Sequence, residues 1–490
     1  MKKGIGEFIA SGLAAPALGL FSAWYGLNRI ARANEVPASQ LGQYCKALDQ
    51  YQYGSGCNSV DLLYLLQQLS LIALAATIAL PLIYWVCAQL LARNGDALAR
   101  YFPPLVRVVI GLLALLLVAH GALVWWATWQ LIEENVMPRN LYVLAIPFFL
   151  GAGLLLAGFS ILADMGRLLA TEALGVTGVV VEPSDYPELH ARVARLAAKL
   201  NSRPPERIIV GIEPTAFVAA MPIRLRGVAE LESAETLYLP CVALRVLDDA
   251  EFDALIGHEL GHFRGADHKF SSRFAPAFKT LEQAVESVSI DDGNENPWMA
   301  IARLPAIGLL TLMSYILAKA ASRLLREREF AADRASLEVS NPAAVVSLLI
   351  KVGILSLQWQ EFRRGLNSLL DRGFGRRNIS LDYLERTRQY LVATTPGDIR
   401  AQLIDMQVPH PLDLHPTIAA RAAAVGVAPE TLIGPVLARL AENRPVPAIL
   451  TKIEEQVTQI DLDYVRVPGH PIKLPEDDSL PPELALPARG

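Results

Sequence analysis

The stretch Leu247-Asp-Asp-Ala-Glu-Phe-Asp-Ala-Leu-Ile-Gly-His-Glu-Leu-Gly-His262 decides how the second half of the chain folds. Asp248 can cap a helix, and Glu251, three residues later, can complete a capping box. Gly265 supplies a natural stop. The stretch therefore predicts a helix from about Asp249 to Arg264.

Two histidines lie on this predicted helix. His258 and His262 are four residues apart, about one helical turn, so both imidazoles leave the same face. Histidines at this spacing can bind one Zn²⁺, and Glu259 between them can act on an activated water as general base. The alternative is an ordinary pair of surface or core histidines. It is disfavoured because the chain has only eight histidines and the other residues of the stretch are mostly apolar.

A third metal ligand is needed, because a catalytic zinc usually takes three protein ligands and leaves a position for water. The best candidate lies in the helical run Ser322–Asp333, where Glu329 and Asp333 share a face at i, i+4. Glu329 would bind the metal, and Asp333 could accept a hydrogen bond from a ligand imidazole. A solvated charged face is the alternative, and Glu327 is also available as a ligand.

Three motifs together resemble a known family. They are His258-Glu259-Leu260-Gly261-His262, Arg328-Glu329-Phe330-Ala331-Ala332-Asp333, and His415-Pro416 with Arg421. They are similar to the membrane zinc metallopeptidases that include HtpX-type heat-shock proteases and CAAX prenyl endopeptidases, over roughly Gly175 to Val427. The resemblance implies one Zn²⁺ per chain, completed by Glu329. It also implies that His415 and Arg421 approach the site, to donate to the oxyanion of a tetrahedral intermediate or to regulate access to zinc.

The chain departs from this family at one strand. Family members often carry Asn-Ala-Phe on the strand that pairs with substrate, whereas here the run is Thr215-Ala216-Phe217. Binding of an extended peptide at Ala216 and Phe217 is therefore a hypothesis. The chain also has four apolar, membrane-length stretches before His258, whereas members of the heat-shock type usually have two.

The first third of the chain contains apolar stretches long enough to cross a membrane. Hydrophobic residues make up 52% of the chain, and the mean hydropathy is +0.32. A hydrocarbon core of about 30 Å needs roughly 20 residues per helix. The sequence predicts four spans, at about Ile5–Leu27, Leu69–Ala92, Val108–Ile132 and Leu141–Ala163. A cleavable signal peptide is the alternative for the first, and it would leave three spans with the same final orientation.

Basic residues predict the orientation of these spans. Lys2, Lys3, three arginines between the second and third stretches, and Arg167 place the N-terminus and everything after the fourth stretch in the cytoplasm. If the membrane is a bacterial inner membrane, Cys45 and Cys57 would then lie on its periplasmic side, which is oxidising. A disulfide between them and two free thiols are equally compatible with the sequence.

Two further apolar segments, Leu304–Ala318 and Ala343–Trp359, are not counted as spans. One membrane crossing at Leu304–Ala318 would place Glu329 on the opposite side of the membrane from His258, and one at Ala343–Trp359 would do the same for His415. The charged segment Ala266–Asn296 cannot supply a second crossing that restores the side. We therefore expect buried or membrane-surface helices there.

The predicted fold class is α+β. Strand candidates lie at Arg207–Ile212, Thr215–Met221 and Thr236–Leu239, beside helices. We expect a transmembrane domain over 1–170 and a zincin-like, mainly helical metallopeptidase domain with a small sheet over 171–430. An extension over 431–490 would follow, with about 20 flexible residues at its end.

These features predict a membrane-anchored, gluzincin-like zinc endopeptidase. It would hydrolyse membrane or membrane-associated proteins with zinc-activated water and Glu259 as general base. The alternatives are a membrane scaffold or chaperone with a latent or structural zinc site, and a prenyl-peptide endopeptidase. Expected partners are protein or peptide substrates and the lipid bilayer. The net charge of −5 argues against nucleic acid, and the sequence does not indicate an oligomeric state.

Overall fold

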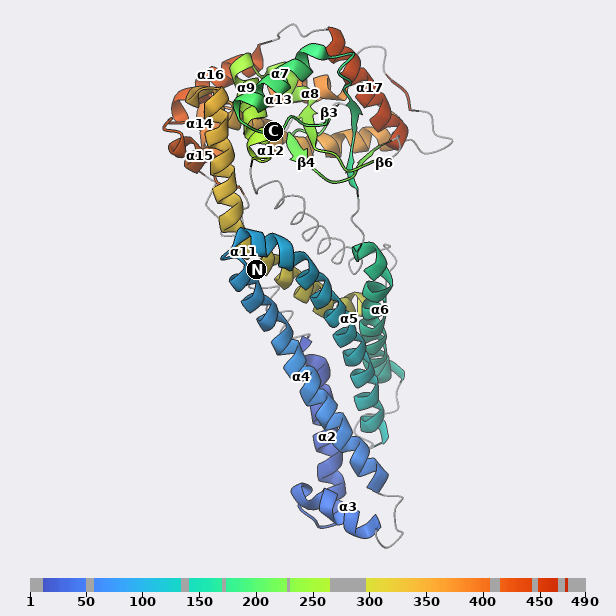
Figure 1. The fold of residues 1–490 in the computed structure, drawn as a ribbon. Coiled ribbons are helices and arrows are strands. Elements are labelled where there is room, and N and C mark those ends of the chain that lie inside the picture. The colour runs from blue at the N-terminus through green and yellow to red at the C-terminus, as the bar shows by residue number, and fades with distance from the viewer. Residues whose placement is uncertain are drawn as a thin grey trace. The chain divides into compact units, whose positions relative to one another are not determined.

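The computed structural model describes residues 12–49, 57–133, 141–169, 173–226, 230–264, 297–405, 415–442, 448–465 and 472–474. The chain divides into two compact units (Figure 1). The N-terminal unit comprises Met1–Thr171 with Arg273–Ala320, and the peptidase unit comprises Glu172–Ser272 with Ala321–Gly490. The described residues 297–320, which the boundaries expected from the sequence place in the second domain, cluster with the N-terminal helices.

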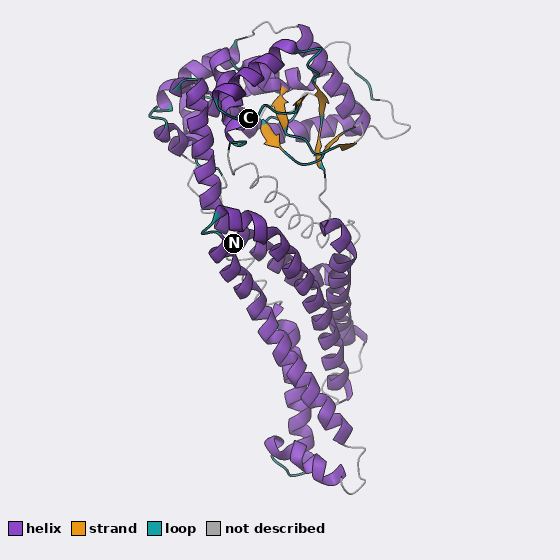
Figure 2. Cartoon of the chain, viewed as in Figure 1, coloured by secondary structure: helices purple, strands orange, loops and turns teal. Residues whose placement is uncertain are grey.

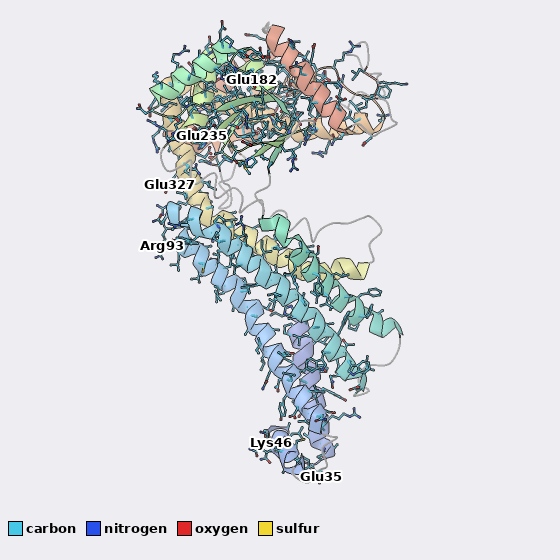
Figure 3. The ribbon with its side chains drawn as sticks, turned by 45° about the vertical axis from the view of Figure 1, so that its right-hand side comes forward. Glu35, Lys46, Arg93, Glu182, Glu235 and Glu327 are labelled. Atoms are coloured by element: carbon cyan, nitrogen blue, oxygen red, sulfur yellow. The ribbon has the colours of Figure 1, made fainter. Side chains whose placement is uncertain are left out.

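The N-terminal unit is a set of long helices. It contains α2 (Ala14–Ala33), a short 3₁₀ turn (Ala38–Gln40), α3 (Leu41–Asp49), α4 (Cys57–Leu91), α5 (Gly95–Glu133), α6 (Leu141–Leu169) and the first part of α11 (Pro297–Val339). Labelled charges lie at its two ends: Glu35 and Lys46 at one, Arg93 at the other (Figure 3). Between them α4 exposes large apolar side chains, including Leu71, Ile72, Ile78, Leu82 and Ile83. An apolar exterior of this kind is suited to lipid.

Four helices in the described residues are long and apolar enough to cross a membrane. They lie at Asn58–Leu91, Arg100–Glu133, Ala145–Ala163 and Pro342–Asp371. The first three correspond to the second, third and fourth predicted spans. Of the first predicted span, residues 12–27 are described, and α2, which begins at Ala14, does not reach this hydropathy.

The fourth of these helices, α12 (Pro342–Asp371), belongs to the core of the peptidase unit. Val346, Ile350 and Ile354 are fully buried in a cluster with residues of α13, α15 and α16. Its Lys351 is also completely buried and paired with Glu251. The structure therefore agrees with the buried helix expected at Ala343–Trp359. The other such segment, Leu304–Ala318, lies in α11 and buries Leu310, Met313 and Leu317 within the N-terminal unit.

The peptidase unit contains two small sheets (Figure 2). One has the order β1 (Leu174–Val176), β5 (Ile223–Leu225), β6 (Glu230–Leu231). The other has the order β2 (Gly178–Val180), β3 (Arg207–Gly211), β7 (Thr236–Pro240), β4 (Phe217–Ala219). β3 and β7 are parallel and buried, and β4 pairs antiparallel with β7 at the edge. Strands thus occur at all three predicted positions, and the α+β fold class is confirmed.

The other regular elements described in this unit are helices. They are α7 (Pro187–Lys199), α8 (Cys241–Val246), α9 (Asp249–Gly261), the second part of α11, α12, α13 (Ile379–Val392), α14 (Pro396–Arg400), a π-helical turn (Ala401–Asp405), α15 (Ile418–Ala424), α16 (Glu430–Ala441) and α17 (Ala448–Val465). The capping box of Asp248 and Glu251 starts α9 as expected, and the helix ends at Gly261, three residues before the predicted end.

Two described helices of the expected extension, 431–490, pack in the core of the peptidase unit. Val436 and Leu440 of α16 are buried against α12. On α17, Glu454 and Asp461 are completely buried and paired with arginines, Glu454 with Arg245. The segment predicted to be flexible lies outside the described residues from 475 onward.

Candidate metal centre and active site

The three predicted metal ligands converge. His258 and His262 project from α9, and Glu329 projects from α11. Their ligand atoms lie within 4.8 Å of one another. The Nε2 atoms of His258 and His262 are 3.3 Å apart. Glu329 Oε2 lies 3.6 Å from His258 Nε2, and Glu329 Oε1 lies 3.7 Å from His262 Nε2. Ligand atoms on one tetrahedral zinc ion are separated by roughly 3.3 Å, so these three residues fit one Zn²⁺.

Glycines on α9 allow α11 to approach closely enough for this arrangement. A Cβ at Gly261 would lie 3.0 Å from the Cα of Ala332, and one at Gly257 would lie 2.5 Å from a methyl group of Val339. The Ser336 hydroxyl also donates to the carbonyl oxygen of Ala254 at 2.8 Å. The backbones therefore touch along this side, which places Glu329 beside the two histidines.

Asp333 and Arg421 support the ligands. The Nδ1–H of His258 donates to Asp333 Oδ1 at 3.1 Å, which leaves Nε2 free for a metal. Arg421 donates to both oxygens of Asp333, at 2.8 and 2.5 Å, and lies 3.4 Å from Glu329. Burial alone would raise the pKa of Asp333, but the hydrogen bonds from Arg421 and His258 lower it. Asp333 thus stays ionised and fixes the His258 ring.

The protonation states of the ligands also suit a cation. Burial lowers the pKa of His262 to about 3, so its ring is neutral and keeps a lone pair. For Glu329 burial raises the pKa, but the hydrogen bond from His415 and the charges of His258 and Arg421 more than offset that effect. The net pKa of Glu329 is well below its usual value. Two imidazoles and a carboxylate are the donor set of many catalytic zinc sites.

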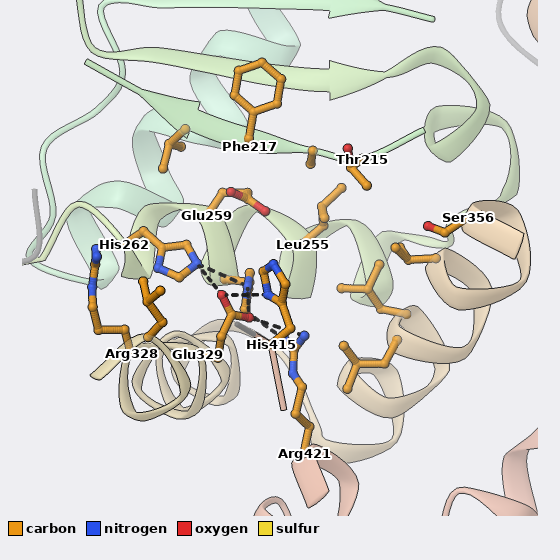
Figure 4. Close-up of a pocket in the computed structure, with 17 residues that line it drawn as sticks. Thr215, Phe217, Leu255, Glu259, His262, Arg328, Glu329, Ser356, His415 and Arg421 are labelled. Atoms are coloured by element: carbon orange, nitrogen blue, oxygen red, sulfur yellow. Dashed lines mark hydrogen bonds and ion pairs between the residues drawn. The ribbon is translucent and has the colours of Figure 1, made fainter. Parts of the chain in front are cut away.

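Glu259 lies next to these ligands on the side of α9 that faces β4 (Figure 4). Its side chain is buried, and burial raises its pKa to about 7. A carboxylate with a pKa near neutrality can both take up and release a proton at physiological pH.

A cavity of about 610 Å³ opens over the site. It is lined by Thr215, Ala216, Phe217, Val218, Leu255, His258, Glu259, His262, Leu325, Arg328, Glu329, Leu348, Leu349, Val352, Ser356, His415 and Arg421. The set includes the two predicted substrate-binding residues on and beside the edge strand, and the Phe217 ring stacks on Tyr238 at 4.7 Å. Sequence reasoning from the residues did not select Arg328 or the α12 wall. The only local signal for this wall is that Val352 follows Leu348 by four residues and Leu349 by three, a spacing that places all three on one face of α12.

His415 reaches the site from the segment before α15. Its Nδ1 lies 3.2 Å from Glu329 Oε1, and its side chain is largely exposed. The hydrogen bond to Glu329 raises its pKa. Periodicity and composition gave no reason to select His415, and only the family resemblance pointed to it. The remaining predicted pair, Cys45 and Cys57, stays a prediction because the Cys57 side chain lies outside the described part of the chain.

The fold and the His-His-Glu cluster are those of a metallopeptidase domain. Residues 183–426 match the family model described as Peptidase family M48, so the chain carries a domain of this family. The expected resemblance to HtpX-type membrane metallopeptidases is confirmed. No solved structure matches the chain.

The chain is also similar to curated proteins named as HtpX homologs. The chain is 27% identical over 173 residues to a protein named Protease HtpX homolog from Archaeoglobus fulgidus, covering 35% of this chain and 48% of the relative. It is 31% identical over 183 residues to a protein of the same name from Moorella thermoacetica, covering 35% and 56%. The chain thus spans about half the length of the curated relatives it matches.

Proposed function

We propose that the protein is a membrane-anchored zinc endopeptidase. The observation that carries the proposal is the convergence of His258, His262 and Glu329 within 4.8 Å, beside a buried Glu259 in a cavity bordered by an edge strand. These three residues would hold a zinc ion, which when bound would supply Lewis-acid polarisation of a carbonyl and a lowered pKa for water.

The residues around the ligands have separate tasks in peptide hydrolysis. Glu259 takes a proton from the attacking water and later gives it to the leaving amine, for which its pKa of about 7 is suited. His415 faces the cavity and can donate to the oxyanion that develops on the substrate. Arg421 positions Asp333 and Glu329, with which it is already paired.

The edge strand gives the substrate a binding mode. β4 pairs on one side with β7, and Ala216 and Phe217 line the cavity. An extended peptide can add to such an edge through main-chain hydrogen bonds. Leu255, Leu348 and Val352 give part of the cavity an aliphatic wall. We therefore expect extended protein segments with an apolar side chain near the scissile bond as substrates.

The membrane helices define where the site works. We propose that the chain lies in a bacterial inner membrane with its peptidase unit in the cytoplasm, and that membrane or membrane-associated proteins are its substrates. Arg93 lies at the opposite end of the N-terminal unit from Glu35 and Lys46, which supports loops on alternate sides (Figure 3). A fluorescent protein fused after Gly490 should fluoresce, and alkaline phosphatase fused there should be inactive. The reverse result contradicts this orientation.

The experiment that tests the activity combines metal analysis with digestion of casein. The purified wild type should contain one zinc per chain and digest casein. Glu259→Gln should retain zinc and lose activity by at least about 10²–10⁴-fold, because the general base is lost while the ligands remain. His258→Ala should lose both. Retained proteolysis in Glu259→Gln contradicts the proposal.

One observation favours a second candidate, a latent zinc site. His415 lies close enough to Glu329 for its ring to approach the metal position. If it occupies the position needed by water, His415→Ala should raise the casein activity. If it helps to stabilise the oxyanion, the same substitution should lower that activity.

A further inference from the structure

A hydrogen-bond network holds the loop that leads into the edge strand β4. The loop, residues 212–216, joins β3 to β4 and contains Glu213. The Glu213 carboxylate accepts the backbone N–H of Thr177 at 3.2 Å and the hydroxyl proton of Tyr238. The backbone N–H of Glu213 donates in return to the Tyr238 oxygen at 3.0 Å. Glu213 therefore ties the loop to β7, which contains Tyr238, and to the residue before β2.

Tyr238 is the fixed centre of this network. It is completely buried, and burial together with the charge of Glu213 raises the pKa of Tyr238 well above its usual value. The hydroxyl therefore stays protonated and can donate to the carboxylate. A Cβ at Gly211 of β3 would clash with both the Tyr238 hydroxyl and the Thr177 carbonyl oxygen. Packing as well as hydrogen bonding thus sets the position of the hydroxyl.

The Tyr238 ring also holds the first residue of β4. Phe217 pairs with Tyr238 in the ladder between β4 and β7, and the two rings stack at 4.7 Å with an angle of 4° between their planes. The Phe217 ring points away from Glu259 (Figure 4). Its neighbours Ala216 and Val218 instead pack in the apolar cluster that contains residues of α9. The stack therefore anchors β4 from the face opposite the cavity.

This anchoring matters because β4 alone is a weak platform for a peptide. It has three residues, and in the described sheet it pairs only with β7. Main-chain hydrogen bonds need donor and acceptor at defined distances and angles. A strand that must first be ordered loses part of the binding free energy to conformational entropy, whereas a strand held in place does not. The Glu213 network and the ring stack supply this order before a peptide arrives.

We propose that Glu213 is a positioning residue for substrate binding. Through Tyr238 and Thr177 it holds the loop 212–216 and β4 in the conformation that accepts the main chain of an extended peptide. Glu213 itself does not line the cavity, so it acts through the strand and not by contact with the substrate. The inference rests on the proposed peptidase function and on its edge-strand binding mode, and it is tested by binding.

The test uses the full zinc-loaded chain in detergent with the Glu259→Gln substitution, so that peptides bind without being cleaved. The probes are a fluorescent hexapeptide of small apolar residues with blocked ends, and copies of it in which one main-chain nitrogen at a time carries a methyl group. Each methyl group removes one N–H donor that pairing with a strand could use. Affinities are measured by fluorescence anisotropy, and zinc content is measured in the same samples.

With Glu213 in place, methylation at one or two positions should weaken binding about tenfold, the effect of one lost main-chain hydrogen bond. Adding Glu213→Ala should weaken binding of the unmethylated peptide by a similar factor. It should change the affinity of the peptides methylated at those positions by less than about twofold, because both changes remove the same hydrogen bond. Zinc content should stay at one per chain.

Three further variants separate positioning from fold stability. Glu213→Gln should retain most of the methylation effect, because its amide can accept the Thr177 N–H and donate to the Tyr238 oxygen, whose own proton then reaches the Thr177 carbonyl oxygen at 3.2 Å. Tyr238→Phe keeps the ring stack and should act like Glu213→Ala, so it serves if the alanine variant folds poorly. Thr236→Val is the matched control: Thr236 is a fully buried residue at the start of β7, and its hydroxyl donates to the Ala234 carbonyl oxygen at 3.2 Å. It should lower stability and leave all peptide affinities unchanged.

Two results would overturn the proposal. The first is a methylation effect that is absent with Glu213 in place, or that is equally large after Glu213→Ala. The second is loss of zinc, or an equal loss of affinity for every peptide, in Glu213→Ala, since a residue that only stabilises the fold would have that effect. The proposed function is judged separately by zinc content and casein digestion in the wild type. Casein digestion without a methylation effect that depends on Glu213 refutes this inference alone, and such an effect in a protein without proteolysis refutes that function alone.

Discussion

The two ends of α9 both carry buried charges, but the charges differ in how they are balanced. At the N-terminal end, Glu251 accepts hydrogen bonds from Lys351 at 2.6 Å and from Ser347 at 2.5 Å. Lys351 and Glu251 are 0% and 1% exposed. At the C-terminal end, the two histidines and Glu329 point at one another beside an open cavity.

This difference shows that burial of charge alone does not mark a functional site. At the N-terminal end every described charge has an opposite charge in contact, because Arg439 also pairs with Asp248 at 2.8 Å. At the C-terminal end the donor atoms converge on a point that an ion can occupy. The first end is expected to affect stability, and the second is expected to affect metal binding and activity.

The largest effect on stability should come from Lys351→Met. Removal of this ammonium leaves the buried Glu251 carboxylate with Arg439, 3.9 Å away, as its remaining described cationic neighbour, which costs about 3–5 kcal/mol. Thermal unfolding of the zinc-loaded protein in detergent should show a much lower melting temperature. The folded variant should keep its zinc, because the metal ligands lie at the other end of α9.

A double variant separates the charge effect from the loss of packing. Glu251→Gln keeps a side chain that can complete the capping box while it removes the carboxylate. Lys351→Met/Glu251→Gln should therefore be more stable than Lys351→Met alone. Equal stability of the single variant and the wild type would contradict a structural role for this pair.

The second prediction concerns pH in the zinc-free protein. Burial raises the pKa of Glu259 from 4.5 to about 7, so the folded protein holds this proton more tightly than the unfolded chain. The stability contributed by Glu259 is present below pH 4.5 and is lost as the pH rises to 7. The Glu259→Gln variant does not lose stability in this way, because glutamine does not ionise. Its stability relative to the wild type should therefore increase by about 3 kcal/mol from pH 4.5 to pH 8.

Chemical unfolding in the presence of a chelator measures this difference. His262 acts in the opposite direction: its pKa of about 3 means that stability is lost as the pH falls below 6.5. His262 is present in both proteins, so its contribution cancels in the comparison. A stability difference that does not change with pH would show that Glu259 is not buried in the zinc-free state.

Asp333→Asn should have the next largest effect, on metal affinity. Asp333 fixes the His258 ring and is itself held by Arg421. Loss of such a supporting carboxylate typically lowers metal affinity by about 10–100-fold. Competition with a fluorescent zinc chelator measures the change. Glu338→Gln is a matched control, because Glu338 also joins α11 to the end of α9, through an ion pair with Arg264 at 2.5 Å, without touching a ligand. An unchanged affinity in Asp333→Asn would contradict its role.

The C-terminal end of α9 could be predicted from the sequence more fully than the N-terminal end. The spacing of His258 and His262 fixes a shared face, and Glu329 was the best downstream carboxylate. In the sequence Lys351 is only a charge that interrupts the apolar segment Ala343–Trp359. Its pairing with Glu251 depends on how α12 packs, which no local pattern states.

Hydropathy also could not separate α12 from the N-terminal helices. Both helices contain an 18-residue window apolar enough to cross a membrane, and 22% of that window is buried in Asn58–Leu91, against 50% in Pro342–Asp371. The sequence excluded α12 as a crossing only because the site residues before and after it must share one compartment. No local pattern indicates that residues 297–320 cluster with the N-terminal helices, or that α16 and α17 belong to the peptidase unit, because both depend on long-range contacts.

The smallest predicted effect belongs to Asp248→Ala. The Asp248 side chain accepts the backbone N–H of Glu251 at 2.9 Å and so caps α9. Loss of an N-cap costs about 1 kcal/mol, which lowers the melting temperature of a domain of this size by about 2–4 °C. Asp249→Ala is the matched control, because the neighbouring Asp249 makes an ion pair with Arg192 but is 93% exposed and does not cap the helix. It should change stability by less than about 0.5 kcal/mol. Both variants should keep zinc affinity and casein activity, since a change at the N-terminal end of α9 must travel through the helix to reach His258. Loss of zinc in Asp248→Ala would mean that the two ends are coupled, and the contrast between them would then no longer hold.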